Sequence, residues 1–161
     1  KKYAQYQEDI DRIARETAEI TETMENLIEK DAEAFEPLSK AYGIPKEAPN
    51  REQVLEEALR VACTAPLEIL REACRLVPLL EELAVKGSRL VLSDVGVSAA
   101  ACAMALRSAA LNVYINTKLM KDRAYAENIN LETKRLCGEQ AVRCESVYAA
   151  VEEALTGGNG E

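Results

Sequence analysis

The sequence predicts an all-α protein, a helical bundle of about five long, partly kinked helices. Aromatic residues make up only 4% of the 161 positions. Alanine, leucine and glutamate are abundant instead, which favours helix over strand. Apolar residues recur every three or four positions, and no strand-length alternating segment appears. At this length we expect one domain, residues 1–161, with a sizeable core.

The first predicted helix covers residues 1–41. Its apolar positions fall on one face, among them Ile10, Ile13, Ile20, Leu27 and Phe35, while acidic and basic residues occupy the others. Pro37 lacks a backbone donor and is expected to kink or restart this helix. Gly43, Pro45 and Pro49 then predict a loop.

The second predicted helix runs from Asn50 to about Arg75. Asn50 is a favourable N-cap, with Gln53 three residues later as its capping-box partner. Pro66 is expected to bend this helix. Pro78 is expected to open or kink a separate short helix, residues 79–86, which Gly87 ends as a C-cap.

Two more helices complete the predicted fold. Ser93 is expected to cap a helix of mostly small residues that ends near Asn116, with Asp94 in its first turn. Asp122 is expected to cap the last helix, about residues 123–155. Residues 156–161 predict a flexible tail.

Composition excludes several classes of function. The net charge of −8 argues against a general nucleic-acid binder. The chain has no histidine, which rules out Ser-His-Asp and Cys-His catalysis and imidazole-dependent zinc sites within it. Its scattered acids predict no metal site. The apolar run Val95–Leu106 is far shorter than the ~20 residues that span a bilayer, so we expect no membrane.

The five cysteines show no C-x-x-C spacing and fall inside helical patterns. Thiols of this kind are typical of small buried hydrophobes in a reducing compartment. The cysteine pattern therefore predicts a cytoplasmic protein.

The helix that follows Ser93 has two contrasting faces. One face is apolar, with Val95, Ala99, Cys102, Leu106, Ala110 and Val113. The other is small and partly polar, with Asp94, Ser98, Ala101, Ala105, Ser108, Asn112 and Asn116. The polar face indicates either a ligand site or a central helix whose polar groups are satisfied locally, with Asp94 as a simple first-turn acid.

Distance along this helix constrains Asp94 and Asn112. They lie eighteen residues apart, which is ~27 Å in a straight helix. Within one subunit they cannot both contact a small reacting centre. If both are functional, they bind opposite ends of a long ligand or meet across a dimer axis.

Two further groups carry reactive side chains. Asp31 and Phe35 are i,i+4 neighbours, and a carboxyl group beside an apolar ring is a candidate for general acid–base chemistry. The alternative is a solvated charged turn. A basic group comprises Arg107, Lys118, Lys121 and Arg123. These cations either complement a helix C-terminus or bind the carboxylates of an anionic substrate.

Three segments together resemble the cyclodeaminase family, which includes the C-terminal domain of formiminotransferase-cyclodeaminase and free-standing bacterial methenyltetrahydrofolate cyclohydrolases. They are Asp-Ala-Glu-Ala-Phe at 31–35 running into Ala-Tyr-Gly-Ile-Pro-Lys at 41–46, Pro-Leu at 66–67, and the stretch from Gly87 through Ser93 and Asp94 to Asn112 and Asn116. Their order and spacing match over nearly the whole chain. The resemblance implies an all-helical homodimer with a folate site in a groove lined by several helices. It also implies a preceding glycine-rich segment and first helix, which this sequence lacks.

The resemblance further implies a folate-dependent one-carbon enzyme. Such an enzyme closes formiminotetrahydrofolate to the methenyl compound with release of ammonia, or hydrolyses methenyl- to 10-formyltetrahydrofolate. It implies catalytic roles for Asp94 and Asp31, hydrogen bonds from Asn112 and Asn116 to pterin or linker amides, and contact of Lys118 or Lys121 with a glutamate or polyglutamate tail. No cofactor beyond the tetrahydrofolate substrate is expected. The alternative is a non-catalytic helical module that binds folate or another protein.

Overall fold

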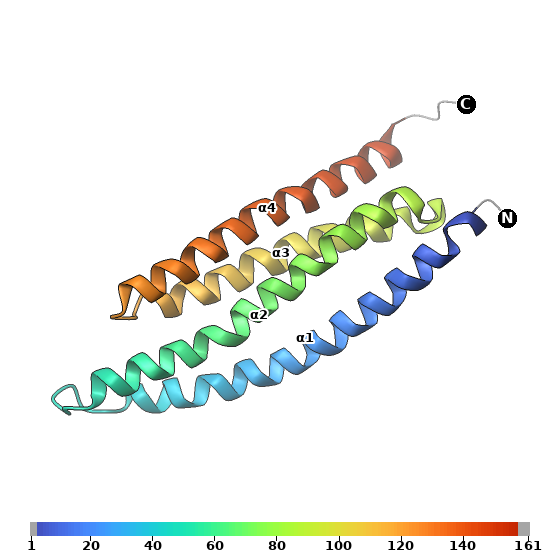
Figure 1. Cartoon of the computed structure of the whole chain (residues 1–161). Helices are drawn as coiled ribbons and strands as arrows, with labels where there is room; N and C mark the ends of the chain where they lie inside the picture. The colour runs from blue at the N-terminus through green and yellow to red at the C-terminus, as the bar shows by residue number, and fades with distance from the viewer. Residues whose placement is uncertain (1–2, 158–161) are drawn as a thin grey trace.

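The computed structural model describes residues 3–157, which form four long α-helices in an elongated bundle (Figure 1). The helices are α1 (Gln7–Tyr42), α2 (Arg51–Lys86), α3 (Leu92–Thr117) and α4 (Arg123–Thr156). Short 3-10 turns, η1 (Ala4–Tyr6) and η2 (Arg89–Val91), precede α1 and α3. The described residues contain no strand, so the all-α prediction is confirmed. Residues 1–2 of the first predicted helix lie outside the described residues.

The prediction of about five helices is wrong, because α2 runs unbroken through Pro66 and Pro78 to Lys86. A proline inside a helix removes one backbone hydrogen bond. Around Pro78 the neighbouring Val77, Leu79 and Leu80 are buried, and their burial offsets that loss. The predicted short helix 79–86 is therefore the last part of α2.

Pro37 likewise does not restart α1, which continues to Tyr42. The residues that follow it, Leu38 and Ala41, are almost fully buried. Figure 1 shows α1 as a curved rather than a straight helix. Packing of the inner face against α2 thus holds the helix together across the proline.

Of two further predicted N-caps, one is confirmed in position only and the other is wrong. Asn50 is the N-cap residue of α2, as predicted. Asn50 makes no side-chain capping bond, so the Asn50–Gln53 capping box does not form. Helix α3 begins at Leu92 rather than after Ser93, and its N-cap residue, Val91, has no capping side chain. The preceding turn η2 is capped instead, since Ser88 Oγ accepts a hydrogen bond from the Leu90 N–H at 3.3 Å.

Two other predicted ends are confirmed. Asp122 caps α4, with its Oδ1 accepting from the Tyr125 N–H at 3.0 Å. Gly87 follows the end of α2, and its N–H donates to the Leu83 carbonyl at 2.8 Å. Helix α4 includes Thr156, so the first residue of the predicted tail is helical, while residues 158–161 lie outside the described residues.

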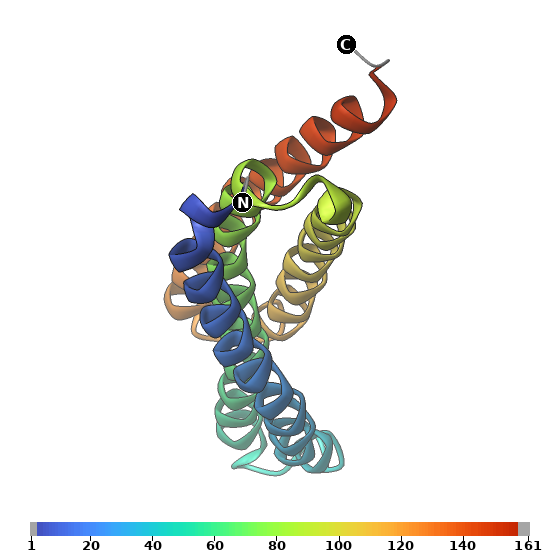
Figure 2. The same cartoon turned by 90° about the vertical axis from the view of Figure 1, so that its right-hand side faces the viewer.

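Helix α2 is the centre of the bundle and packs against each of the other three long helices. Helix α1 packs mainly on α2, whereas α3 and α4 form the most extensive pair. Figure 2 shows α1 and α3 diverging from each other, with α2 between them. The predicted apolar face of α3 is confirmed, because all six of its positions are buried in this core.

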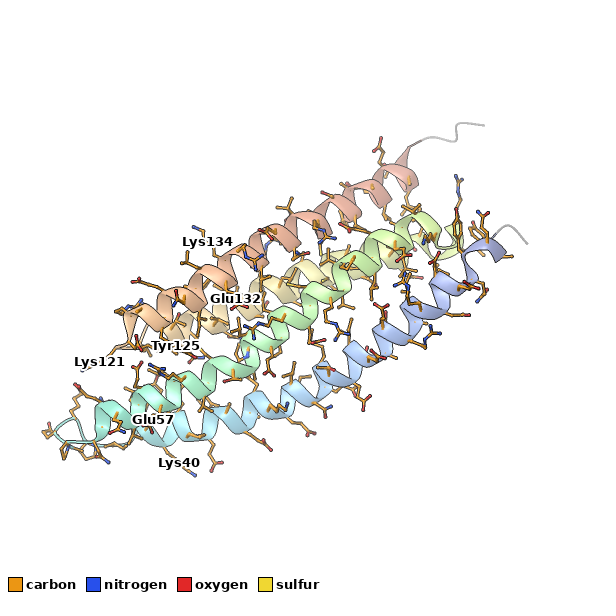
Figure 3. The ribbon with its side chains drawn as sticks, viewed as in Figure 1. Lys40, Glu57, Lys121, Tyr125, Glu132 and Lys134 are labelled. Atoms are coloured by element: carbon orange, nitrogen blue, oxygen red, sulfur yellow. The ribbon has the colours of Figure 1, made fainter. Side chains whose placement is uncertain are left out.

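Ion pairs between helices lie along the outside of the core. Arg143 joins α4 to Glu81 of α2, with Nε to Oε1 at 2.7 Å, and this hydrogen bond lowers the pKa of the Glu81 carboxyl. Arg71 of α2 meets Glu132 of α4 at 2.7 Å. Lys86 near the end of α2 meets Asp9 of α1 at 2.6 Å. Figure 3 shows such charged side chains, Glu132 among them, around the four helices.

Helix α3 is unusually apolar for its degree of burial. Within the described residues, Arg89–Thr117 is the one stretch that could cross a membrane by length and composition alone, with a mean hydropathy of 1.5. The core helix of a soluble protein passes the same test. The expectation that this region is too short is therefore wrong. Only 33% of its most apolar window is buried, which leaves Val97, Met104 and Leu111 exposed at 67%, 64% and 67%.

Candidate active site

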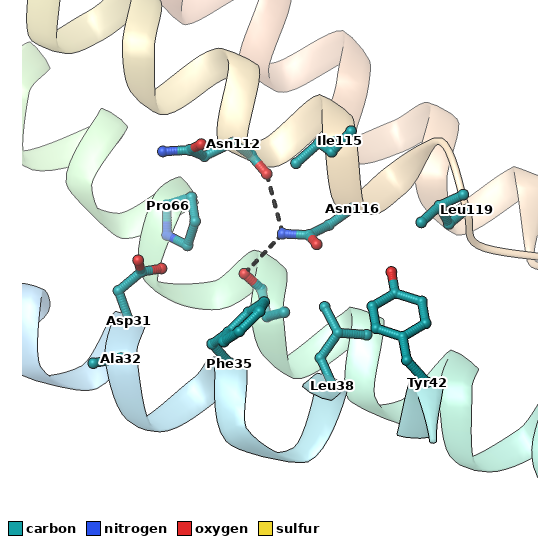
Figure 4. Close-up of a pocket in the computed structure, with 11 residues that line it drawn as sticks. Asp31, Ala32, Phe35, Leu38, Tyr42, Pro66, Asn112, Ile115, Asn116 and Leu119 are labelled. Atoms are coloured by element: carbon teal, nitrogen blue, oxygen red, sulfur yellow. Dashed lines mark hydrogen bonds between the residues drawn. The ribbon is translucent and has the colours of Figure 1, made fainter. Parts of the chain in front are cut away.

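A cavity of about 450 Å³ lies where α1, α2 and the C-terminal half of α3 meet (Figure 4). Its carboxylate and carboxamide side chains are Asp31 of α1 and Asn112 and Asn116 of α3, and Tyr42 of α1 adds a hydroxyl group. Two groups of residues that are about eighty positions apart in sequence therefore share one groove. Neither sequence spacing nor helical periodicity alone could predict this meeting, since it depends on how α1 and α3 pack on α2.

The groove walls carry apolar side chains that remain open to solvent. Phe35 is 58% exposed and Tyr42 47% exposed on the α1 side. Ile115 is 59% exposed and Leu119 47% exposed on the opposite side. Exposed rings and aliphatic groups around a concave surface are typical of sites that bind a planar apolar ligand.

The Asn116 side chain is fixed at the base of the groove. Its Nδ2 donates to two backbone carbonyls, Ala62 O of α2 and Asn112 O of α3, each at 3.1 Å (Figure 4). Its Oδ1 faces the groove. The sequence left open whether the polar groups of this helix are hydrogen-bonded within the protein. For Asn116 this is true of the amide nitrogen, whereas the amide oxygen stays available to a ligand.

Asp31 is half-buried and points into the groove from α1, one helical turn before Phe35 (Figure 4). Within residues 3–157 its carboxylate has no hydrogen-bond or ion-pair partner. A carboxylate on a groove wall without a structural partner is free to exchange protons with a ligand or a water molecule.

Asp94 lies in the first turn of α3 and is exposed. Helix α3 is continuous between Asp94 and Asn112, so the predicted separation of ~27 Å holds. Asp94 does not line the groove. The structure therefore brings Asp31, Asn112 and Asn116 together and leaves Asp94 at the other end of α3.

The basic residues after α3 mostly have structural partners. Lys121 (labelled in Figure 3) pairs with the Glu52 carboxylate of α2, and this hydrogen bond lowers the pKa of Glu52. Arg123 Nη1 donates to the Thr117 carbonyl at 2.9 Å and to the Met120 carbonyl at 3.2 Å, closing the end of α3.

The other two cations differ. Arg107 pairs with Glu145 of α4. Lys118 is exposed beside the groove residues Asn116 and Leu119, and in the described part of the chain its ammonium group has no ion-pair partner. Of the two lysines expected to meet a ligand tail, Lys118 is thus the one without a competing carboxylate.

The thiols lie away from the groove. Cys63, Cys102 and Cys144 are buried, as the sequence predicts, whereas Cys74 and Cys137 are only half-buried. Burial raises the pKa of the Cys63 thiol to about 11, so it stays protonated and acts as a small hydrophobe. Among the described residues, no group of three or more His, Cys, Asp or Glu side chains is arranged to hold a metal ion.

Some lining residues had no signal in the sequence. In the helical pattern Ile115 and Leu119 are ordinary apolar positions near the end of a helix, and Pro66 predicts a bend. Pro66 and Ile115 lie in segments that carry the family resemblance, but nothing in the pattern gave them a place in the site. What distinguishes them is exposure toward a cavity, which depends on the distance between helices.

Comparison with known proteins identifies relatives that match most of the chain. The sequence pattern of the formiminotransferase-cyclodeaminase family matches residues 1–135. A methenyltetrahydrofolate cyclohydrolase from Methylorubrum extorquens is 36% identical over 159 residues, covering 96% of this chain and 76% of that protein. A formimidoyltransferase-cyclodeaminase from Sus scrofa is 33% identical over 131 residues, covering 79% of this chain but 24% of the much longer pig protein.

A solved structure also has the same fold. It is the crystal structure of a formiminotetrahydrofolate cyclodeaminase from Thermotoga maritima at 2.80 Å resolution. The two superpose with a TM-score of 0.77 at 29% sequence identity, over 98% of this chain and 74% of the other.

Proposed function

The chain belongs to the formiminotransferase-cyclodeaminase family, and we propose that it is a folate-dependent one-carbon enzyme. Its reaction is hydrolysis of methenyltetrahydrofolate or cyclodeamination of formiminotetrahydrofolate with release of ammonia. The observation that carries this proposal is the groove, which is lined by one unpartnered carboxylate, two carboxamides and two exposed aromatic rings. These residues come from the segments on which the family resemblance rests.

The groove suits a folate in size and chemistry. Its volume of about 450 Å³ is within the range of small-molecule sites. Phe35 and Tyr42 offer faces against which a pterin or aminobenzoyl ring can stack. Asn112 and Asn116 hydrogen-bond the polar edge of the ring or the linker amide. Lys118, which is exposed and follows the groove residue Asn116 by two positions, meets the glutamate or polyglutamate tail, and Lys121 joins it by exchanging its pairing with Glu52.

Asp31 performs the proton transfer. In the hydrolysis its carboxylate accepts a proton from the water that attacks the methenyl carbon, and returns a proton to N5 as the bond between N5 and that carbon breaks. In the cyclodeamination N10 of the folate attacks the formimino carbon, and Asp31 takes the proton that N10 loses. Asp31 then donates this proton to the formimino nitrogen, whose bond to carbon breaks to release ammonia. One carboxyl group therefore serves both reactions, and no cofactor beyond the tetrahydrofolate substrate is needed.

Asp94 contributes from the other subunit of a homodimer. The exposed residues Val97, Met104 and Leu111 recur every seven positions on one stripe of α3. In an antiparallel pair of α3 helices centred on Met104, Val97 of each copy meets Leu111 of the other. The same symmetry carries Asp94 of one copy to the level of Asn112 and Asn116 of the other, where it can act on the water or the leaving amine.

The family resemblance also implies a glycine-rich segment and a helix ahead of α1. A second, apolar cavity of about 380 Å³ lies along α1 and α2 and reaches Ser98 of α3. Together with the exposed small residues of α3, this cavity provides a surface on which one more helix can pack beside the groove. A reducing cytoplasmic setting is supported by the five thiols, which are all free.

The test is the decay of methenyltetrahydrofolate absorbance with purified protein. We expect acceleration above the buffer rate, and Asp31→Asn should lower turnover by roughly a hundredfold because the proton-transfer group is lost. Glu29→Gln is the matched control, since it removes a carboxylate from an exposed position of α1 that does not line the groove. A chain extended at its N-terminus should be measured beside this one.

Two outcomes would contradict the proposal. Equal turnover in Asp31→Asn and Glu29→Gln would remove Asp31 from the chemistry. If neither chain length accelerates the decay, and formiminotetrahydrofolate releases no ammonia either, the non-catalytic folate-binding or protein-interaction module becomes the better description.

A further inference from the structure

Pro66 leaves one carbonyl of α2 without its helical donor. In an α-helix the N–H of residue 66 would donate to the carbonyl of Ala62, four positions earlier. Proline has no N–H, so this bond cannot form. The Ala62 carbonyl lies beside the groove, which both Ala62 and Pro66 line.

The Asn116 amide of α3 supplies the missing donor. Its Nδ2 lies 3.1 Å from the Ala62 oxygen and 3.1 Å from the Asn112 oxygen (Figure 4). Both neighbours are carbonyls, which only accept hydrogen bonds. Rotating the amide by a half-turn would place its oxygen against two oxygens, so the orientation is fixed with Oδ1 toward the groove.

We propose that Pro66 is a positioning residue that sets the hydrogen-bonding character of the groove through Asn116. At this point the groove presents a hydrogen-bond acceptor, Asn116 Oδ1, and not the amide donor. It therefore selects a ligand that presents an N–H here, as the amide and amino edge of a pterin does. The choice of a pterin rests on the proposed function, whereas the locked amide does not.

A double-mutant cycle on stability tests the lock without any ligand. In the otherwise native chain, Asn116→Asp places a carboxylate against two carbonyl oxygens, so the melting temperature should fall clearly. In the Pro66→Ala background, the new N–H of residue 66 takes the Ala62 carbonyl. The fall caused by Asn116→Asp should then be roughly halved, since one of the two opposed carbonyls has found another donor. Equal falls in both backgrounds would overturn the lock.

Ligand binding tests the consequence for the site. Pro66→Ala frees the Asn116 amide to rotate, and we expect the KM for methenyltetrahydrofolate to rise about three- to tenfold while kcat changes little. Pro78→Ala is the matched control, because it makes the same change in the same helix at an exposed position outside the groove. It should retain the native KM.

The outcomes separate this inference from the proposed function. A native KM in Pro66→Ala, or an equal rise in Pro78→Ala, would overturn the positioning role. If the native chain itself fails to bind or turn over folates, the proposed function fails. The stability cycle then still decides whether Pro66 orients Asn116.

Discussion

Thr133 of α4 is a fully buried residue with an unsatisfied polar atom. Its side-chain oxygen has no hydrogen-bond partner, and the residue is 0% exposed. A buried hydroxyl loses its hydrogen bonds to water on folding, and without a partner in the protein no new hydrogen bond offsets this desolvation cost. We therefore predict that Thr133→Val, which replaces the hydroxyl by a methyl group, raises the free energy of unfolding by about 1 kcal/mol.

Thr117 provides the control within the same fold. It is also 0% exposed, but its hydroxyl donates to Asn130 Oδ1 at 2.7 Å. Thr117→Val should lower the free energy of unfolding by about 1–3 kcal/mol, since Asn130 loses its donor. Urea denaturation of both variants measures the two effects. Stabilisation of neither, or destabilisation of both by equal amounts, would contradict the assignment.

At the scale of the helix, two glycines in α3 and α4 have opposite surroundings. A Cβ added to Gly96 of α3 would lie 2.9 Å from Cγ1 of Val151 in α4. A Cβ added to Gly138 of α4 would have no neighbour within 4 Å. Gly96 therefore permits the close approach of the two helices, and Gly138 only weakens its own helix.

The same substitution should thus have opposite effects at the two sites. We predict that Gly96→Ala destabilises the protein by about 1–3 kcal/mol through overpacking. Gly138→Ala should stabilise it by up to about 1 kcal/mol through helix propensity. Thermal unfolding measures both. Val151→Ala should relieve much of the defect of Gly96→Ala, and failure of that rescue would rule out the steric explanation.

The prolines inside α1 and α2 show that a helical sequence pattern carries no information about the packing that offsets a lost hydrogen bond. Pro37, Pro66 and Pro78 predicted kinks or breaks, because the local rule counts only the lost hydrogen bond. In the structure α1 and α2 continue through all three. Burial of neighbouring side chains offsets the loss, and at Pro66 a side chain from another helix replaces the missing donor.

At the scale of the whole molecule, the exposed stripe of α3 predicts association of two chains. A glutamate at Leu111, which is 67% exposed, would be harmless on a monomer surface but unfavourable in an apolar interface. We predict that the native chain elutes from gel filtration as a dimer and that Leu111→Glu shifts it to a monomer. Glu139→Gln, at an exposed position of α4, is the control and should not shift it. Elution of the native chain as a monomer would exclude the proposed pairing.

The dimer also gives Asp94 a direct test. If Asp94 of one subunit acts in the groove of the other, Asp31→Asn and Asp94→Asn should each lose roughly a hundredfold in turnover. Mixing the two inactive variants after unfolding and refolding together should then restore activity, because some dimers contain one intact groove. Native turnover in Asp94→Asn would end its assignment.

The sequence by itself determined the helical class, the apolar face of α3, the caps at Asp122 and Gly87, and the carboxylate and carboxamide candidates. These features follow from spacing along one helix or from local hydrogen bonds, which neighbours in the chain decide. Only the tertiary structure decided that Asp31, Asn112 and Asn116 share a groove, that Asp94 lies apart from it, and that Lys121 is paired with Glu52. Those relations depend on where one helix packs against another, a balance of burial and hydrogen bonding over the whole bundle that no local pattern contains.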